Sequence, residues 1–64
     1  MEQIQMQTRN GWRTICTARG HVEEEGSHDS FEIYWALKHG SPGTYATLRI
    51  IDETGRIVEG EGAE

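Results

Sequence analysis

This chain of 64 residues has few residues that could form disulfides, and its first residues do not resemble a targeting segment. It contains one cysteine, one proline and one phenylalanine. The single cysteine, Cys16, excludes an intramolecular disulfide and is typical of proteins in a reducing compartment. The first ten residues, MEQIQMQTRN, lack the apolar run of a signal peptide or a membrane span. We therefore expect a cytoplasmic protein without membrane contact.

Positive charge is also scarce. Six Lys and Arg residues stand against eleven Asp and Glu residues, which gives a formal net charge of −5. Nucleic-acid binding depends on cations that neutralise phosphates, so this balance disfavours that class of protein. The hydrophobic content of 34% is low for a globular chain. A domain this small has a thin core, and self-association as a homo-oligomer is a common remedy.

Residues 31–60 hold most of the apolar side chains and read as three strands joined by two turns. Residues 40–43, Gly-Ser-Pro-Gly, and residues 53–55, Glu-Thr-Gly, have the composition of tight turns. Side chains alternate across a strand, so these two turns together define one wholly apolar face of a sheet. That predicted apolar face comprises Phe31, Ile33, Trp35, Leu37, Ala46, Leu48, Ile50 and Val58.

Residues 2–19 predict a separate hairpin. Asn10-Gly11 is a strong signal for a two-residue turn, which would pair Arg9 with Trp12. An isolated hairpin is unstable in water, so its apolar residues must pack on the later strands. Ile4, Met6 and Ile15 lie on one face of this predicted hairpin and are the residues expected to join the core.

The favoured fold is all-β, with five antiparallel strands in meander order that form a small open barrel or a two-layer sheet. The strands are expected at about residues 2–9, 12–19, 30–38, 44–51 and 56–60. Residues 1–58 would form one domain, and residues 59–64, EGEGAE, a flexible acidic tail.

The alternative fold is α+β, with residues 30–39 helical on a four-stranded antiparallel sheet. Asp29 and Glu32 have the spacing of a capping box, and Gly40 stands where a helix often ends. The aromatic and β-branched run Phe-Glu-Ile-Tyr-Trp favours the strand instead.

Residues 20–29, GHVEEEGSHD, form a polar connection whose carboxylates and imidazoles are suitable metal ligands. Their spacing matches no known metal-binding loop, and Cys16 has no CxxC or HxxxH partner pattern. No nucleophile has a base placed beside it by spacing. We therefore expect a solvated loop, neither metal nor cofactor, and a protein that is not an enzyme.

The second face of the meander indicates a function. Tyrosine and arginine are enriched among the residues that dominate protein interfaces, and this face mixes them with apolar side chains. We therefore predict a small acidic interaction module that binds a protein partner, as a regulator or inhibitor of a larger enzyme. Small acidic proteins of this kind are frequent among virus- and mobile-element-encoded proteins, an analogy of size and charge alone. The predicted contact residues are Tyr34, Tyr45, Arg49, Ile51 and Ile57, with Glu23, Glu24 and Glu25 as an acidic second element.

Three alternatives stay open for this face. The predicted register places Arg49 opposite Tyr34 and Lys38 opposite Tyr45, which suits cation–π contact. Tyr34 and Tyr45 could then form a stacking platform for single-stranded nucleic acid. Ile51 and Ile57 could be buried in a homodimer, because the edge strands carry unpaired backbone groups. The first hairpin could also cover this face, which would make it part of the core.

Overall fold

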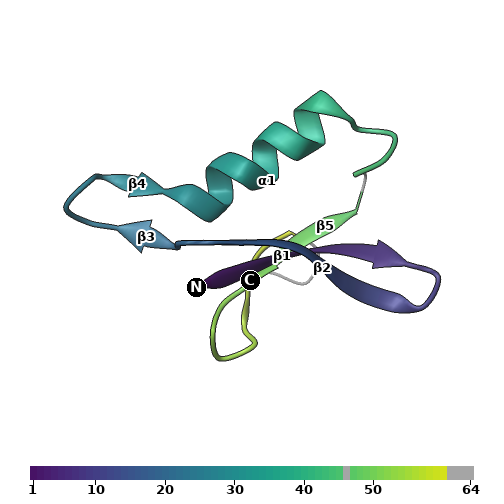
Figure 1. The fold of residues 1–64 in the computed structure, drawn as a ribbon, viewed down its shortest axis with the longest axis horizontal. Helices are drawn as coiled ribbons and strands as arrows, with labels where there is room; N and C mark the ends of the chain where they lie inside the picture. Colours follow the sequence, from purple (N-terminus) through teal and green to yellow (C-terminus); the bar gives the residue numbers. More distant parts are fainter. Residues whose placement is uncertain (46, 61–64) are drawn as a thin grey trace.

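The computed structural model describes residues 1–45 and 47–60 and contains a sheet, a helix and a small ribbon (Figure 1). In chain order, the elements are β1 (Glu2–Thr8), β2 (Gly11–Ala18), β3 (His21–Val22), β4 (Ser27–His28), α1 (Asp29–Gly40), β5 (Leu48–Ile51) and β6 (Ile57–Gly60). The main sheet has the order β2-β1-β5-β6 and is antiparallel throughout, and β3 and β4 form a second, two-stranded sheet.

The strand prediction for residues 30–38 is wrong, and with it the five-stranded meander. Residues Asp29–Gly40 are helical, which confirms the α+β alternative. Acidic residues occupy the first turn of α1 and basic residues the last, as the helix dipole favours. The helix ends where the N–H of Ser41 donates to the carbonyl of Leu37 at 3.0 Å, and Pro42 cannot continue it.

The helical state is decided by burial rather than by local propensity. Phe31, Tyr34 and Leu37 recur every third residue, so a helix turns all three toward the sheet. Ile33 and Trp35, which the strand pattern assigned to the apolar face, are turned away and are exposed by 36% and 43%. That part of the apolar-face prediction is therefore wrong.

β1 occupies the centre of the sheet, between β2 and β5, instead of an outer position. Because α1 takes residues 29–40 out of the sheet, β5 pairs with β1, and Ile4 stands opposite Ile50. Both side chains are fully buried.

The first hairpin forms as expected but in a different register. Thr8 faces Gly11, whose φ of +106° suits a glycine, so Arg9 and Asn10 form the loop. Trp12 consequently lies opposite Gln7 and not Arg9. A β-bulge between residues 4 and 5 of β1 shifts the ladder again further along.

The second hairpin confirms the predicted pairing of Ile51 with Ile57. The N–H of Asp52 donates to the carbonyl of Arg56 at 2.9 Å, and Gly55 has a φ of +88°. An irregularity after Ile50 then places it opposite Glu59 rather than Val58. Glu59 and Gly60, which the predictions assigned both to the last strand and to the acidic tail, form the end of β6. Residues 61–64 lie outside the described residues, as does Ala46.

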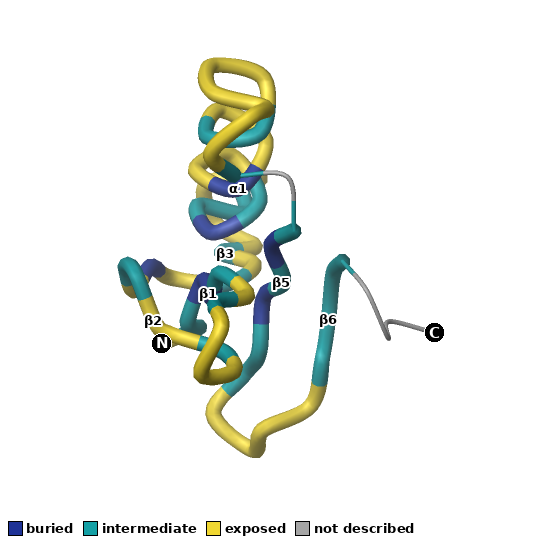
Figure 2. The backbone as a smooth tube through the Cα atoms, turned by 90° about the vertical axis from the view of Figure 1, so that its right-hand side faces the viewer, coloured by how far each residue is buried: buried dark blue, intermediate teal, exposed yellow. Residues whose placement is uncertain are grey.

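The core lies between α1 and one face of the sheet (Figure 2). Its buried members are Ile4, Tyr34, Leu48 and Ile50, and the partly buried side chains packed against them are Met6, Ile15, Cys16, Phe31, Leu37, Tyr45 and Val58. The expectation that the first hairpin contributes Ile4, Met6 and Ile15 to the core is confirmed.

A polar cluster fastens the start of β1 to the start of α1. The Glu2 carboxylate accepts a hydrogen bond from the hydroxyl of Ser30 at 2.5 Å and lies 3.1 Å from Nε2 of His28. Ser30 is fully buried, so this carboxylate is the acceptor that makes its burial tolerable.

Candidate interaction face

One face of the four-stranded sheet has no described helix or strand packed on it. Figure 1 shows α1 on the other side of the sheet, with the β3–β4 ribbon projecting beyond one end. The strand registers define the members of this uncovered face by their pairings across the sheet. They are Gln3, Gln5, Gln7, Trp12, Thr14, Thr17, Arg49, Ile51, Ile57 and Gly60.

An arginine stacked on a tryptophan forms the middle of the uncovered face. The guanidinium carbon of Arg49 lies 4.2 Å from the centre of the Trp12 ring. Nε of Arg49 donates to Oε1 of Gln5 at 2.8 Å, which fixes the plane of the guanidinium. Gln5, on the central strand, is only 9% exposed. A cation–π contact of this kind holds a long side chain in one conformation before any partner arrives.

The glutamine side of the face is a connected hydrogen-bond network. Gln5 donates to the hydroxyl of Thr14 at 3.1 Å, and Thr14 donates to Oε1 of Gln3 at 2.8 Å. In the described part of the chain, no buried side-chain nitrogen or oxygen lacks a hydrogen-bond partner. The network therefore orders the polar side chains of an uncovered surface.

The opposite end of the face is apolar. Ile51 pairs with Ile57 on β6 and with Gln3 on β1, and both isoleucines are partly buried. An arginine–tryptophan stack beside an apolar pair and a rim of amides has the composition of a protein-binding surface.

The charge of this face differs from that of the whole chain. None of the ten members is acidic, and Arg49 is the one charged residue among them, although the chain carries a net charge of −5. The acidic residues of the described chain instead lie in the β3–β4 turn, in the β5–β6 turn and along α1 and the strand ends.

Three of the predicted contact residues come together on this face, and the two tyrosines do not. Arg49, Ile51 and Ile57 share it, as predicted. Tyr34 is only 2% exposed and packs in the core, and Tyr45 is partly buried against the same core. The predicted placement of Tyr34 opposite Arg49 is wrong, because the helix turns Tyr34 to the covered side of the sheet.

The cation–π pairs in the structure differ from the predicted pairs of Arg49 with Tyr34 and Lys38 with Tyr45. Lys38 lies one helical turn beyond Tyr34, with its Nζ 5.2 Å from the ring centre and 3.4 Å from the hydroxyl oxygen. The partner of Arg49 is Trp12. Lys38 therefore caps the core tyrosine, and the pairing expected between Lys38 and Tyr45 is not the one formed.

The acidic element does not adjoin the uncovered face. Glu23, Glu24 and Glu25 form the exposed turn of the β3–β4 ribbon, which projects from the end of the molecule (Figure 1). Glu25 pairs with Arg19 at 3.1 Å, and Arg19 also pairs with Asp29 at 2.8 Å. These carboxylates raise the pKa of the Arg19 guanidinium, with Asp29 the larger cause. Where we expected a flexible loop, the chain forms a hydrogen-bonded ribbon.

Trp12 is the one aromatic residue of the face, and it was not among the contact residues predicted from the sequence. Alternation in the first hairpin does place it on the glutamine side of β2. Its contact with Arg49 arises only because β5 pairs with β1, which brings residues 37 positions apart together. Pairing between distant strands leaves no local signal in the sequence.

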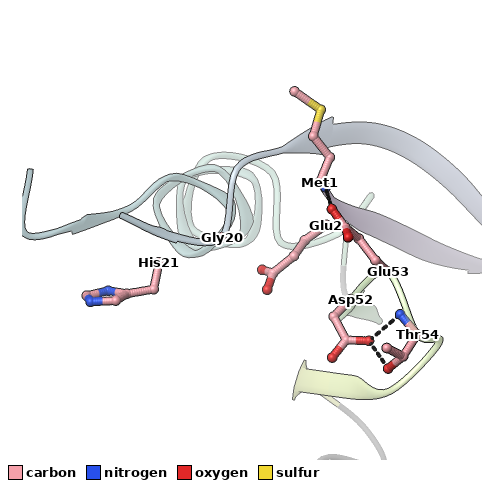
Figure 3. Close-up of a pocket in the computed structure, with 7 residues that line it drawn as sticks. All are labelled: Met1, Glu2, Gly20, His21, Asp52, Glu53 and Thr54. Carbon is pink, nitrogen blue, oxygen red and sulfur yellow. Dashed lines mark hydrogen bonds and ion pairs between the residues drawn. The ribbon is translucent and has the colours of Figure 1, made fainter. Parts of the chain in front are cut away.

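A shallow cleft of about 380 Å³ lies elsewhere, between the start of β1 and the β5–β6 turn (Figure 3). Its lining residues are Met1, Glu2, Gly20, His21, Asp52, Glu53 and Thr54. Its carboxylates are already engaged within the chain. Glu53 contacts the amino group of Met1, Asp52 accepts from the N–H and the hydroxyl of Thr54, and Glu2 serves Ser30 and His28.

The turn that borders this cleft has one perturbed acid. The hydroxyl of Thr54, 2.6 Å away, is the main cause that lowers the pKa of Asp52, and backbone N–H groups add to it. The carboxylate is therefore held ionised as part of the turn structure. We find a structural role for the cleft carboxylates and no chemistry that they share.

The described residues contain no cluster of metal-ligating side chains. Across residues 1–45 and 47–60, no three His, Cys, Asp or Glu side chains gather as a metal site would require. Cys16 stands opposite Ile4, and partial burial raises the pKa of its thiol, which lowers its reactivity. No helix in this part of the chain has the length and apolar character needed to cross a bilayer.

No family model, curated protein sequence or solved structure matches this chain.

Proposed function

We propose that this protein is a small non-enzymatic interaction module that binds a protein partner through the uncovered face of its sheet. The observation that carries the proposal is the Trp12–Arg49 stack, held in place by Gln5 on a surface that nothing in the described chain covers. Tryptophan and arginine are the residues most enriched among interface hot spots.

The face is also prepared for binding. Ordering a long side chain at an interface costs affinity, and Arg49 is ordered in advance by its stack and its hydrogen bond. Within the described residues, its Nε is the donor already in use. The Nη donors are then available to a partner's acceptor groups, and a carboxylate matches their fork geometry.

The regulatory side of the proposal rests on size and charge. A chain of 64 residues with a thin core has little room for a substrate pocket, and can act on a larger enzyme by covering part of its surface. A cytoplasmic address remains our prediction from the sequence. The Glu23–Glu25 turn stays a candidate second contact, at a distance from the main face.

Binding of single-stranded nucleic acid is the second candidate, with weaker support. The stacking platform expected of Tyr34 and Tyr45 is not exposed, because Tyr34 lies in the core. Trp12 alone could offer a ring on the uncovered face, with Arg49 beside it. One ring and one cation are less than the groove of stacking and charge that such proteins use.

The test is affinity capture from the lysate of the organism that encodes the chain, with and without nuclease. The wild type is compared with Trp12→Ala/Arg49→Ala. The control, Arg9→Ala/Arg13→Ala, removes two exposed side chains from positions outside the uncovered face. We expect a nuclease-resistant protein partner whose recovery falls about tenfold or more in the first variant only.

Two results would contradict the proposal. Equal loss of the partner in both variants would show that the uncovered face is not the contact. Recovery of nucleic acid alone, released by moderate salt, would favour the second candidate.

A further inference from the structure

The outer surface of α1 is a second unpartnered surface, on the side of the molecule away from the uncovered sheet face. The exposed helix positions are Glu32, Ile33, Trp35, Ala36, His39 and Gly40. Large hydrophobic side chains are exposed at three places in the described chain, and two of them, Ile33 and Trp35, lie here. Figure 2 shows exposed backbone along the part of α1 that stands furthest from the sheet.

The order of residues along this surface is complementary to itself. Glu32, Ala36 and His39 follow the spacing of one helical stripe, with an acid at one end, a small residue at the centre and an imidazole at the other end. Glu32 and His39 are seven residues apart, about 10 Å along the axis, and cannot meet within one helix. They meet when a second copy of the helix lies antiparallel across the first.

We propose that two copies of this chain associate through the outer surface of α1, with the helices antiparallel and crossing at Ala36. Glu32 of each copy then faces His39 of the other, and the two Trp35 rings lie side by side at the crossing. Ile33 packs over Gly40 of the second copy, where no atom lies within 4 Å of an added Cβ. The small side chains at the centre allow the close approach that helix packing needs.

The antiparallel orientation follows from charge. Parallel helices would place Glu32 against Glu32 and would align the two helix dipoles unfavourably. The antiparallel pair instead places each acidic first turn, with Asp29 and Glu32, beside the last turn of the other copy, with Lys38 and His39. The uncovered sheet face is not used, so the dimer would present two such faces on its opposite sides.

The dimer should be weak, because a helix of 12 residues offers less than the roughly 800 Å² per partner of a standard interface. The test is sedimentation equilibrium of the full chain from about 10 µM to 1 mM, where we expect a dissociation constant of roughly tens of micromolar. Glu32→Lys and His39→Glu should each weaken the dimer about tenfold, since each loses two symmetric pairs.

The double variant Glu32→Lys/His39→Glu should regain the wild-type dissociation constant. Both changes oppose the helix dipole, so recovery in the double variant cannot come from a more stable helix. Far-UV circular dichroism checks that each variant folds. If a charge reversal prevents folding, the neutral variants Glu32→Gln and His39→Gln take its place. In a Cys16→Ser background, Ala36→Cys should form a disulfide-linked dimer on oxidation, and Thr17→Cys should not.

The proposal is overturned by a monomer at every concentration, or by a dimer that the single charge reversals do not weaken. A dimer that Ile57→Glu abolishes while the charge reversals leave it intact would place the contact on the uncovered sheet face instead. The proposal does not depend on the function of that face.

Discussion

At the scale of single residues, burial separates side chains that look alike in the sequence. Tyr34 and Trp35 are neighbours, yet the first is 2% exposed and the second 43%. Their rings meet edge to face, with centres 5.0 Å apart, so the core tyrosine is flanked by the surface tryptophan. A tyrosine and an arginine both suggested binding, and only the arginine lies on an open surface.

Tyr34 provides the residue-scale prediction. Tyr34→Ala removes the largest fully buried side chain, and loss of a buried aromatic costs about 3–5 kcal/mol. A domain of this size has a total stability of about 5 kcal/mol, so we expect the variant to be largely unfolded. Tyr34→Phe loses only the contact of the hydroxyl with Lys38 and should stay folded. Urea unfolding followed by circular dichroism distinguishes them, and a folded Tyr34→Ala would contradict the core assignment.

At the scale of elements, the strand and the helix competed for residues 29–40. Period-two alternation and the aromatic and β-branched run favoured a strand, while the capping-box spacing of Asp29 and Glu32 and the position of Gly40 favoured a helix. The helix forms because the four-stranded sheet is complete without these residues, and α1 buries the apolar side chains on one face of that sheet. The sequence of residues 29–40 alone could not distinguish the two states, because it contains both patterns.

Gly60 provides the element-scale prediction. Its φ is +100°, and an added Cβ would lie 2.5 Å from the carbonyl oxygen of Leu48 and 2.9 Å from Cα of Arg49. Gly60→Ala should therefore detach the end of β6 from β5. Gly43→Ala is the matched control, because no atom lies within 4 Å of its added Cβ.

Amide hydrogen exchange measures the effect of these substitutions. We expect the amides of β6 to lose about tenfold or more of their protection in Gly60→Ala and to keep it in Gly43→Ala. Because β6 carries Ile57, the same variant should also weaken partner binding through the uncovered face. Unchanged exchange in β6 would show that the strand adapts to the added methyl group.

At the scale of the whole molecule, one layer of helix covers one side of a four-stranded sheet. β1 pairs with β2 and with β5, and α1 contacts all three of these strands. The single core leaves two surfaces without a partner, the uncovered sheet face and the outer surface of α1. These two surfaces lie on opposite sides of the molecule.

This shared core provides the whole-molecule prediction. Because β1 connects the hairpin, the helix and β5, we expect one cooperative unfolding transition. Far-UV circular dichroism and tryptophan fluorescence should give the same midpoint in urea, with a slope of about 1 kcal/mol per molar. Trp12 lies on the sheet and Trp35 on the helix, so separate midpoints would show that the two layers unfold independently.

Features that depend on neighbouring residues could be predicted from the sequence. The turn at Gly55, the pairing of Ile51 with Ile57 and the apolar character of Leu48 and Ile50 all follow from local chemistry and alternation. The absence of an internal disulfide follows from one cysteine. Three of the five main predicted contact residues, Arg49, Ile51 and Ile57, were placed on one face correctly, because they belong to one hairpin.

Features that depend on residues far apart in the chain could not be predicted from the sequence and are visible only in the tertiary structure. The pairing of β1 with β5 placed Arg49 on Trp12, and the need to cover the opposite sheet face made residues 29–40 a helix and buried Tyr34. Burial of apolar area acts between surfaces and is not directional. Neither the β1–β5 pairing nor the helix over residues 29–40 can therefore be predicted from a short stretch of sequence.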